Sequence, residues 1–379
     1  MQVINHRKVM KSFKSDLELS IKENYNNYFG KENYDEHRFG KYPPKKIVFR
    51  IRLARIIKYF AARFIRFDSN PFIQSFLKNY GNGLQLLWEN LNETDKGLLI
   101  KLIVFRLLGY RTIKLPTNNP FYWEKLESLS EYIDKNDYYD PNFMHFILYK
   151  VDLNKLGFDI KFYHTKIGVL NDFILEQYAY KNDGEKIVYA EKDDIVIDCG
   201  GCWGDTALYF ANSVGVNGKV YCFEFIPNNI KILNINVQLN KILSEIIELI
   251  PSPVSDKSDV NIYFKDNGPA SKIKEVSFEG QTGQVKTITI DDFVSRNSIN
   301  KVNFIKMDIE GTEPFALKGA EKTIRKFRPK LAIAIYHSMG DFINIPKWIL
   351  ELNLDYEIYL GHYTIHSEET IIFAKPRIK

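Results

Sequence analysis

The stretch DIVIDCGGCWGDTALYFA, residues 194–211, decides the fold of this chain. It opens with a short β-branched run, residues 195–197, that ends abruptly in Asp198 and two glycines, which is typical of a buried parallel strand before its turn. A helix is predicted to begin near Asp205, with Thr206 in its first turn and apolar residues facing the sheet. The loop between strand and helix therefore faces a helix N-terminus.

A glycine-rich loop at a helix N-terminus predicts a nucleotide-like ligand, because glycines let a ligand approach the backbone and free amides favour electron-rich groups. A dinucleotide fingerprint beginning at Gly200 would need two further glycines where this chain has Cys202 and Asp205. The loop instead leaves room for a ligand without phosphates, such as S-adenosylmethionine. The cofactor-binding residues predicted from this stretch are Asp198, Gly200, Gly201, Trp203, Gly204, Asp205 and Thr206.

An acidic residue ends the next predicted strand, about twenty residues further along, where a carboxylate can accept hydrogen bonds from both hydroxyls of a ribose. That residue is Glu224, at the end of strand 219–224, and Phe225 follows it. We expect both side chains to contact the cofactor.

Four sequence blocks carry a resemblance to a known family. They are VIDCGGCWGDTALYFA, VYCFEFIPNN, FIKMDIEGTE and LAIAIYHS, and together they span residues 195–338. In this order they resemble the FkbM family of S-adenosylmethionine-dependent O-methyltransferases. The resemblance implies a Rossmann-like class I methyltransferase fold, S-adenosylmethionine as cofactor, and an alcohol acceptor on a sugar or a polyketide-type molecule.

The predicted architecture is an α/β fold in two parts. Residues 151–379 would form the methyltransferase domain around a seven-stranded, mostly parallel sheet, and residues 1–150 a mainly helical extension on the acceptor side. The extension carries 25 Lys and Arg against 16 Asp and Glu, while the remainder carries 27 against 31. This basicity favours an anionic surface or ligand but is too mild to predict nucleic acid. A homodimer is compatible with this organisation.

Polar side chains crowd the end of the predicted fourth strand, NFIKMD, residues 303–308. Open α/β sheets bind ligands at the carboxyl ends of their strands. Since an alcohol needs a general base during methyl transfer, His337 at the end of the fifth strand and Asp308 are the candidates. Lys306, or a divalent cation held by Asp308 and Glu310, would stabilise the developing alkoxide. For nearby Glu313, a helix-capping role is at least as good an interpretation.

The acceptor is predicted to be a sugar, a nucleotide sugar or a surface glycan, because the extension is basic and rich in aromatic residues. Gln177 and Tyr178 lie shortly before the first strand, where a helix would pass the cofactor, and Ser271 lies in a loop inserted before the fourth strand. With Glu310 and His337, these residues form the predicted acceptor site.

Residues 45–67 predict a basic amphipathic helix with eight basic residues and no acidic ones. Such a helix can lie on anionic lipid at the inner face of a membrane, or it can be a surface helix with solvated arginines. The arginines and lysine on its polar face are Arg52, Arg55, Lys58, Arg63 and Arg66.

Two other classes of function remain as alternatives. An NAD-dependent Rossmann oxidoreductase is weakened by the missing glycines, and a non-catalytic glycan- or membrane-binding protein is weakened by the intact loop and Glu224. The chain shows no signal peptide and no apolar run long enough to span a bilayer, so a cytoplasmic location is expected. Cys199, Cys202 and Cys222 are interpreted as reduced structural thiols, because no nearby His completes a zinc site.

Overall fold

A seven-stranded sheet forms the centre of the computed structural model, which describes residues 6–43, 70–269 and 271–377. The strand order is β14-β15-β13-β12-β6-β7-β8. Only β15 within this sheet runs antiparallel to its neighbours. The strands are β6 (Ile195–Cys199), β7 (Lys219–Phe223), β8 (Ile247–Ile250), β12 (Phe304–Met307), β13 (Lys330–Ala334), β14 (Tyr356–His362) and β15 (Thr370–Pro376). This is the predicted Rossmann-like class I methyltransferase fold.

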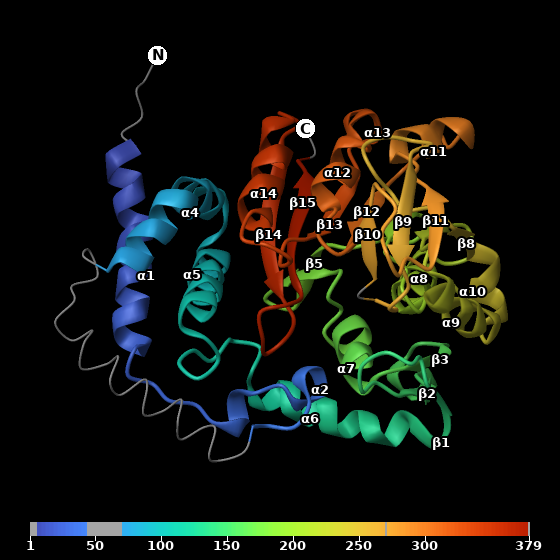
Figure 1. Cartoon of the computed structure of the whole chain (residues 1–379), viewed down its shortest axis with the longest axis horizontal. Helices are drawn as coiled ribbons and strands as arrows, with labels where there is room; N and C mark the ends of the chain where they lie inside the picture. The colour runs from blue at the N-terminus through green and yellow to red at the C-terminus, as the bar shows by residue number, and fades with distance from the viewer. Residues whose placement is uncertain (1–5, 44–69, 270, 378–379) are drawn as a thin grey trace.

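Helices cover both faces of the sheet (Figure 1). Because successive strand residues point to opposite faces, Val196 packs on one layer of helices and Ile197 on the other. The first layer contains α8 (Asp205–Val214), α9 (Pro227–Gln238) and α10 (Lys241–Ile246). Helix α6 (Pro120–Ser128) packs away from the sheet, on the turns Leu129–Tyr132 and Leu170–Ile174. The second contains α11 (Ile290–Arg296), α12 (Glu313–Lys318), α13 (Glu321–Phe327) and α14 (Asp341–Glu351). Each face thus buries one set of alternating strand side chains.

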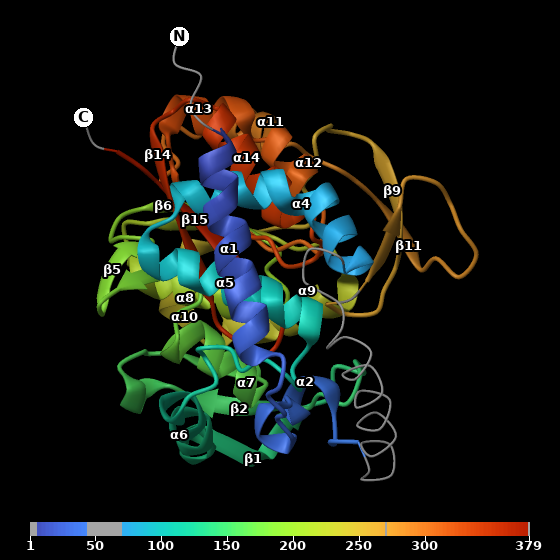
Figure 2. The same ribbon diagram turned by 90° about the vertical axis from the view of Figure 1, so that its left-hand side faces the viewer.

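The N-terminal helices α1 (His6–Asn24), α4 (Pro71–Asn90) and α5 (Glu93–Leu108) extend the second layer beyond the edge of the sheet. Figure 2 shows all three on the side that faces the viewer. Asp95 of α5 accepts hydrogen bonds from the backbone N–H of Leu360 in edge strand β14 and from the Tyr180 hydroxyl. The helical extension therefore shares one hydrophobic core with the sheet and satisfies part of its edge.

A small antiparallel sheet, β1-β2-β3, lies apart from the main one. Its strands are β1 (Ile133–Tyr139), β2 (Leu148–Asp152) and β3 (Lys161–His164), so β2 runs across residue 150 and links the two predicted regions. A second small sheet, in the order β10-β9-β11, forms the predicted insertion. The other α-helices and strands of the described residues are α2 (Glu36–Phe39), α7 (Lys166–Val169), β4 (Tyr180–Asn182), β5 (Glu185–Val188), β9 (Asn261–Lys265), β10 (Lys272–Lys274) and β11 (Gly283–Lys286).

The basic helix predicted at residues 45–67 lies outside the described residues. Among the helices that the structure describes, none combines the length and the apolar character needed to cross a bilayer.

Candidate functional site

The carboxyl ends of β6, β7, β12 and β13 open onto a cavity of about 610 Å³, a size ordinary for small-molecule sites. Side chains that precede the sheet and the β9–β11 insertion complete its wall. Of the predicted site residues, the cavity wall contains Gln177, Tyr178, Gly200, Trp203, Asp205, Thr206, Glu224, Phe225, Ser271, Lys306, Asp308, Glu310 and His337. Asp198, Gly201 and Gly204 are not part of this wall.

The glycines of the loop after β6 are needed for packing against other parts of the chain. Gly200 has φ of 93°, and a Cβ there would lie 1.9 Å from the carbonyl oxygen of Asp308. A Cβ on Gly201 would lie 2.1 Å from the Sγ of Cys222. Glycine at these two positions is therefore required by neighbouring protein atoms, and the predicted approach of a ligand to this loop stays a prediction.

A buried ion pair lies beneath the glycine loop. The Lys306 Nζ is 3.0 Å from Asp198 Oδ1, and the two side chains are 1% and 0% exposed. Lys306 also donates hydrogen bonds to the carbonyl oxygens of Gly200 (2.7 Å) and Cys199 (3.3 Å), while Thr206 donates to Asp198 Oδ2. Burial lowers the pKa of Lys306, but the carboxylates of Asp198, Asp308 and Asp205 together outweigh burial and raise it.

The predicted role of Lys306 as the stabiliser of an alkoxide stays a prediction. An ammonium group has three N–H donors; two of them form hydrogen bonds to the carbonyl oxygens of Gly200 and Cys199, and Asp198 makes an ion pair with the ammonium. Lys306 thus positions the loop after β6, and its side chain also lines the cavity.

Glu224 lies at the end of β7, with its carboxylate buried in the cavity wall. Its Oε1 accepts hydrogen bonds from the backbone N–H groups of Phe225 and Ile226, and its Oε2 from the side chain of Asn229. Burial raises the pKa of Glu224, and these hydrogen bonds oppose the shift without cancelling it. A carboxylate offers about four lone-pair sites, so Oε2 retains capacity for a ligand hydroxyl.

Asp308 follows β12 and accepts hydrogen bonds from two tyrosines. The Tyr178 hydroxyl donates to Oδ2 at 3.0 Å, and the Tyr336 hydroxyl lies 3.0 and 3.1 Å from the two carboxylate oxygens. Tyr178 is itself only 3% exposed and its ring packs under the ammonium of Lys306. Tyr178 therefore positions Asp308, and its predicted contact with the acceptor stays a prediction.

His337 lies among three carboxylates. Its Nδ1 is 3.3 Å from Glu313 Oε1, and its Nε2 is 3.5 Å from Asp308 Oδ1 and 3.8 Å from Glu310 Oε2. Burial lowers the pKa of His337, but the carboxylates, Glu313 first, raise it to about 9. The imidazole therefore carries two protons at neutral pH and cannot act as a base until it loses one.

Glu310 is the carboxylate of this cluster that reaches furthest into solvent, with 56% of its side chain exposed. Its backbone has φ of 59°, which turns the chain sharply between β12 and α12. Desolvation, followed by the charge of Asp308, raises the pKa of Glu310 to about 7. Glu310 is thus half ionised near neutral pH and can exchange a proton there.

A cation could also be held at this end of the cavity. One ligand atom each from Asp308, Glu313 and His337 lies within 4.8 Å of the others. A metal ion would require a neutral His337 ring. Without a metal ion, the three carboxylates favour the protonated ring. Glu313, which is fully buried, accepts hydrogen bonds from the backbone N–H groups of Ile309 and Gly311 in the loop before α12, so a structural role in that loop agrees with the structure.

Two other predicted acceptor residues line the cavity. The Gln177 side chain is 6% exposed, and its Oε1 is buried without a partner among the described residues. The Ser271 hydroxyl donates to the carbonyl oxygen of Gly268 within the insertion loop. Ser271 therefore shapes that loop and reaches the cavity from it.

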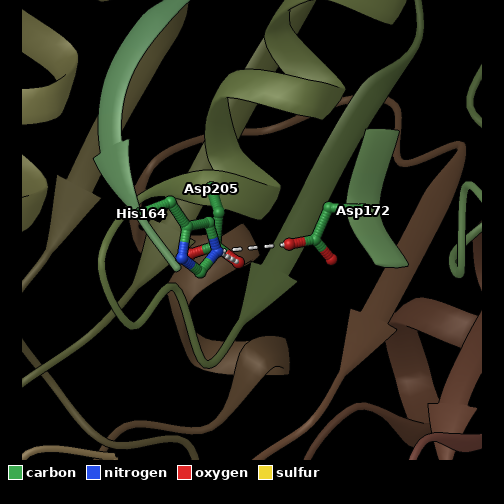
Figure 3. A group of neighbouring side chains, drawn as sticks. All are labelled: His164, Asp172 and Asp205. Carbon is green, nitrogen blue, oxygen red and sulfur yellow. Dashed lines mark ion pairs between the residues drawn. The ribbon is translucent and has the colours of Figure 1, made fainter. Parts of the chain in front are cut away.

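Several residues of the wall were not predicted from the sequence. His164 ends β3, and Asp172 lies in the following turn of π-helix, Leu170–Ile174. The His164 Nε2 lies 3.4 Å from Asp172 Oδ2 and 3.5 Å from Asp205 Oδ2 (Figure 3). No local sequence pattern predicts this cluster, because its members come from three separate elements. Asn171, Asn229, Tyr336 and Glu369 were missed for the same reason.

Comparison with known proteins matches the part of the chain that contains the sheet strands at the cavity. Residues 181–358 match the family model described as the methyltransferase FkbM domain. The hexuronic acid methyltransferase AglP of Haloferax volcanii is 27% identical over 169 residues, which make up 45% of this chain and 66% of that protein. The chain thus spans just under two thirds of the length of this curated relative.

Solved structures with similar folds are more distant. The methyltransferase FkbM from Methylobacillus flagellatus KT has a TM-score of 0.49 at 19% identity, covering 79% of this chain and 60% of that chain. The fibrillarin of Aeropyrum pernix, solved with natively bound S-adenosyl-L-methionine, has a TM-score of 0.33 at 14% identity, covering 60% and 93%. Because both TM-scores are below 0.5, the fold is assigned from the strand order of the sheet.

Proposed function

We propose, from the premise that residues 181–358 are a methyltransferase domain of the FkbM family, that this protein is an S-adenosylmethionine-dependent O-methyltransferase. Its acceptor would be a hydroxyl group of a sugar, a nucleotide sugar or a surface glycan. The observation that carries the proposal is that the matched segment contains the strands whose carboxyl ends form the cavity.

The residues of the cavity fit the proposed cofactor. Beside Glu224, the Oδ1 of Asn229 is buried and has no hydrogen-bond partner among the described residues, as expected where a polar ligand group is to be received. The carboxylate of Glu224 would hold the ribose, with Phe225 and Val254 beside the base. When bound, S-adenosylmethionine supplies an electrophilic methyl group on a sulfonium.

The protein's own contribution is to align the acceptor and to take its proton as the new bond forms. Among the sequence-derived candidates, Asp308 already accepts from two tyrosine hydroxyls, and His337 is protonated at neutral pH. The hydrogen bonds occupy lone pairs of Asp308, and His337 must lose a proton before it can act as a base. Glu310, with its pKa raised to about 7 and its side chain partly in solvent, is our proposed general base.

The acceptor proposal rests on residues that come before the matched segment and line the cavity. Arg38 and Arg106 of the N-terminal region reach the cavity, as do the aromatic rings of Phe143 and Phe146. Aromatic faces stack on sugar rings, and guanidinium groups pair with carboxylate or phosphate. AglP is named for its action on hexuronic acid, and an acidic sugar or a nucleotide sugar is accordingly the acceptor class to test first.

Calorimetry with S-adenosylhomocysteine and with NAD tests the cofactor, and transfer of a labelled methyl group to a panel of nucleotide sugars and uronic acids tests the reaction. We expect binding of S-adenosylhomocysteine and label in an acid-stable ether. Tight binding of NAD without binding of S-adenosylhomocysteine would favour the oxidoreductase alternative instead. Adding a chelator separates metal-dependent from metal-independent transfer.

A cytoplasmic location and a homodimer remain predictions of the sequence.

A further inference from the structure

A guanidinium group without a counter-charge lines the cavity on the side of the N-terminal extension. Arg106 lies in the last turn of α5, and its side chain is part of the cavity wall. Its Nη2 donates to the carbonyl oxygens of Tyr336 (3.1 Å) and Ser367 (2.7 Å). Its Nε is buried and has no hydrogen-bond partner among the described residues. Because an arginine has five N–H donors, the one on Nε and both on Nη1 are left without an acceptor in the described parts of the chain.

The charge of Arg106 is also unpaired among the described residues. The carboxylates whose charges act on it are Glu368 and Asp341, and neither forms an ion pair with it. Glu368 pairs with Arg38 at 2.7 Å. Asp341 accepts from the backbone N–H of Ser338 at 2.7 Å. Burial lowers the pKa of Arg106 and outweighs both carboxylates. Since buried charges in proteins are normally paired, an anion from outside the chain is the missing partner.

Two other arginines of the N-terminal extension provide a contrast. Arg38 also lines the cavity, but Glu368 neutralises its charge. Arg111 is 8% exposed and donates to the hydroxyls of Tyr28 and Tyr42, and it is not part of the cavity wall. Arg106 differs from both, because it lines the cavity and has no carboxylate partner among the described residues.

The guanidinium of Arg106 is held in a fixed orientation. Its central carbon lies 4.8 Å from the centroid of the Phe342 ring, and Nη2 bonds two carbonyl oxygens from different parts of the chain. A planar guanidinium matches the two oxygens of a carboxylate or a phosphate, and it loses little conformational entropy when it is already ordered. Arg106 is therefore organised for an anion before that anion arrives.

The acidic residues that follow Ser367 do not oppose an anion at this place. Glu369 lies immediately before β15, lines the cavity, and has a buried Oε2 without a partner among the described residues. Burial, followed by the charge of Asp308, raises the pKa of Glu369 well above its ordinary value. Glu369 is therefore neutral near pH 7, and the charge of Glu368 is compensated by Arg38.

Tyr336 connects Arg106 with the polar cluster after β12. Its backbone carbonyl oxygen accepts from Arg106, and its hydroxyl donates to Asp308 at 3.0 Å. The two places are thus separated by the length of one tyrosine residue. A single sugar ring with its substituents has a comparable length, so one ring can reach from Arg106 to the carboxylates.

We propose that Arg106 is the anion subsite of the acceptor. It binds a carboxylate or phosphate group that is carried on the same sugar ring as the hydroxyl that receives the methyl group. The inference rests on the proposed function and deepens it, because it fixes where the charge of the acceptor lies relative to its reacting hydroxyl. Arg38 supports the subsite by neutralising Glu368.

Three sugars test the subsite: glucuronate carries a carboxylate on the ring, glucose 1-phosphate carries a phosphate, and glucose carries neither. Binding is titrated by NMR on protein saturated with S-adenosylhomocysteine. We expect wild type to bind one of the anionic sugars on the order of tenfold to a hundredfold more tightly than glucose, as for hydrogen bonds to a charged group. The sugar that binds more tightly identifies the anion. Arg106→Met should remove this preference and change the binding of glucose by less than about twofold.

Arg106→Lys is the second variant, in case Arg106→Met fails to fold. Lysine keeps the charge and can still donate to the carbonyl oxygens of Tyr336 and Ser367, but it lacks the planar fork and should lose most of the preference. Arg111→Met is the matched control, since Arg111 is a buried arginine of the same extension outside the cavity wall. This control should leave the binding of all three sugars unchanged.

Equal binding of the three sugars by wild type would overturn the subsite. It would also be overturned if both Arg106 variants kept the preference, or if they lost glucose and the anionic sugars equally, as expected of a purely structural residue. Wild type that binds S-adenosylhomocysteine but none of the sugars would overturn the subsite and leave the proposed cofactor standing. Wild type that does not bind S-adenosylhomocysteine would refute the proposed function itself.

Discussion

Replacement of Lys306 by Met should destabilise the protein far more than a typical lysine substitution. Lys306 and Asp198 are 1% and 0% exposed with their charged atoms 3.0 Å apart, so the variant leaves a carboxylate buried without its counter-charge. Breaking a buried ion pair by removing one partner costs about 3–5 kcal/mol. The variant also loses the hydrogen bonds to the carbonyl oxygens of Cys199 and Gly200.

The double variant Lys306→Met/Asp198→Asn isolates the ion pair. Each single change leaves one buried charge unpaired, and two independent losses of about 3–5 kcal/mol would sum to about 6–10 kcal/mol. The double variant buries no charge, and its remaining amide can still accept from Thr206, as Asp198 does now. We therefore expect its loss to be close to that of one single variant, which gives a coupling energy of about 3–5 kcal/mol.

Urea unfolding at neutral pH, followed by far-UV circular dichroism, measures these free energies. The matched control is Lys347→Met, since Lys347 and Glu351 form a 3.7 Å pair with 52% and 64% of their side chains exposed. Such a surface pair contributes less than about 1 kcal/mol. If Lys306→Met costs no more than the control, or if the two single losses simply add, the buried pair does not hold the loop as described.

Three further predictions concern activity and binding. If Glu310 is the base, turnover should rise as pH increases through about 7, because only the ionised carboxylate accepts a proton. Glu310→Gln should lose this rise and lower the rate by about 10²- to 10⁴-fold. A rise in turnover centred near pH 9 would point to His337 instead. Glu224→Ala should weaken S-adenosylhomocysteine by about 1.5–3 kcal/mol, measured by calorimetry, and unchanged affinity would exclude the ribose contact. The basic segment 45–67 should cosediment with anionic vesicles in a salt-sensitive way, at about 1 kcal/mol per basic residue near the surface, and equal partitioning to neutral vesicles would contradict this.

The sequence by itself determined the main sheet and where its ligand end lies. Residues 195–197 read as a buried strand because β-branched residues run together and stop at Asp198 and the glycines, and β6 and α8 follow that pattern. The same local logic located Glu224 at the end of β7 and the polar cluster after β12. These features depend on residues adjacent in the chain, so they can be predicted without a structure.

The secondary structure of the N-terminal extension, residues 1–150, was harder to predict from the sequence. Strand β1 has the sequence IDKNDYY, which is polar and partly exposed, so it lacks the apolar alternation that announces a strand. Its pairing with β2 stabilises it in the tertiary structure. Propensity and pattern are weak where most side chains face solvent, and partners distant in the chain then decide the conformation.

Only the tertiary structure decided what each polar residue does. Lys306 was predicted to be a catalytic cation from its place among carboxylates, and parallel pairing of β12 with β6 sets it beside Asp198, with which it forms a buried ion pair. His337 looked like a free base, but Glu313 and Asp308 enclose it and raise its pKa. The cluster of His164, Asp172 and Asp205 has no sequence signature at all. Protonation and hydrogen bonding depend on distances of a few ångströms between residues far apart in the chain, and only packing sets those distances.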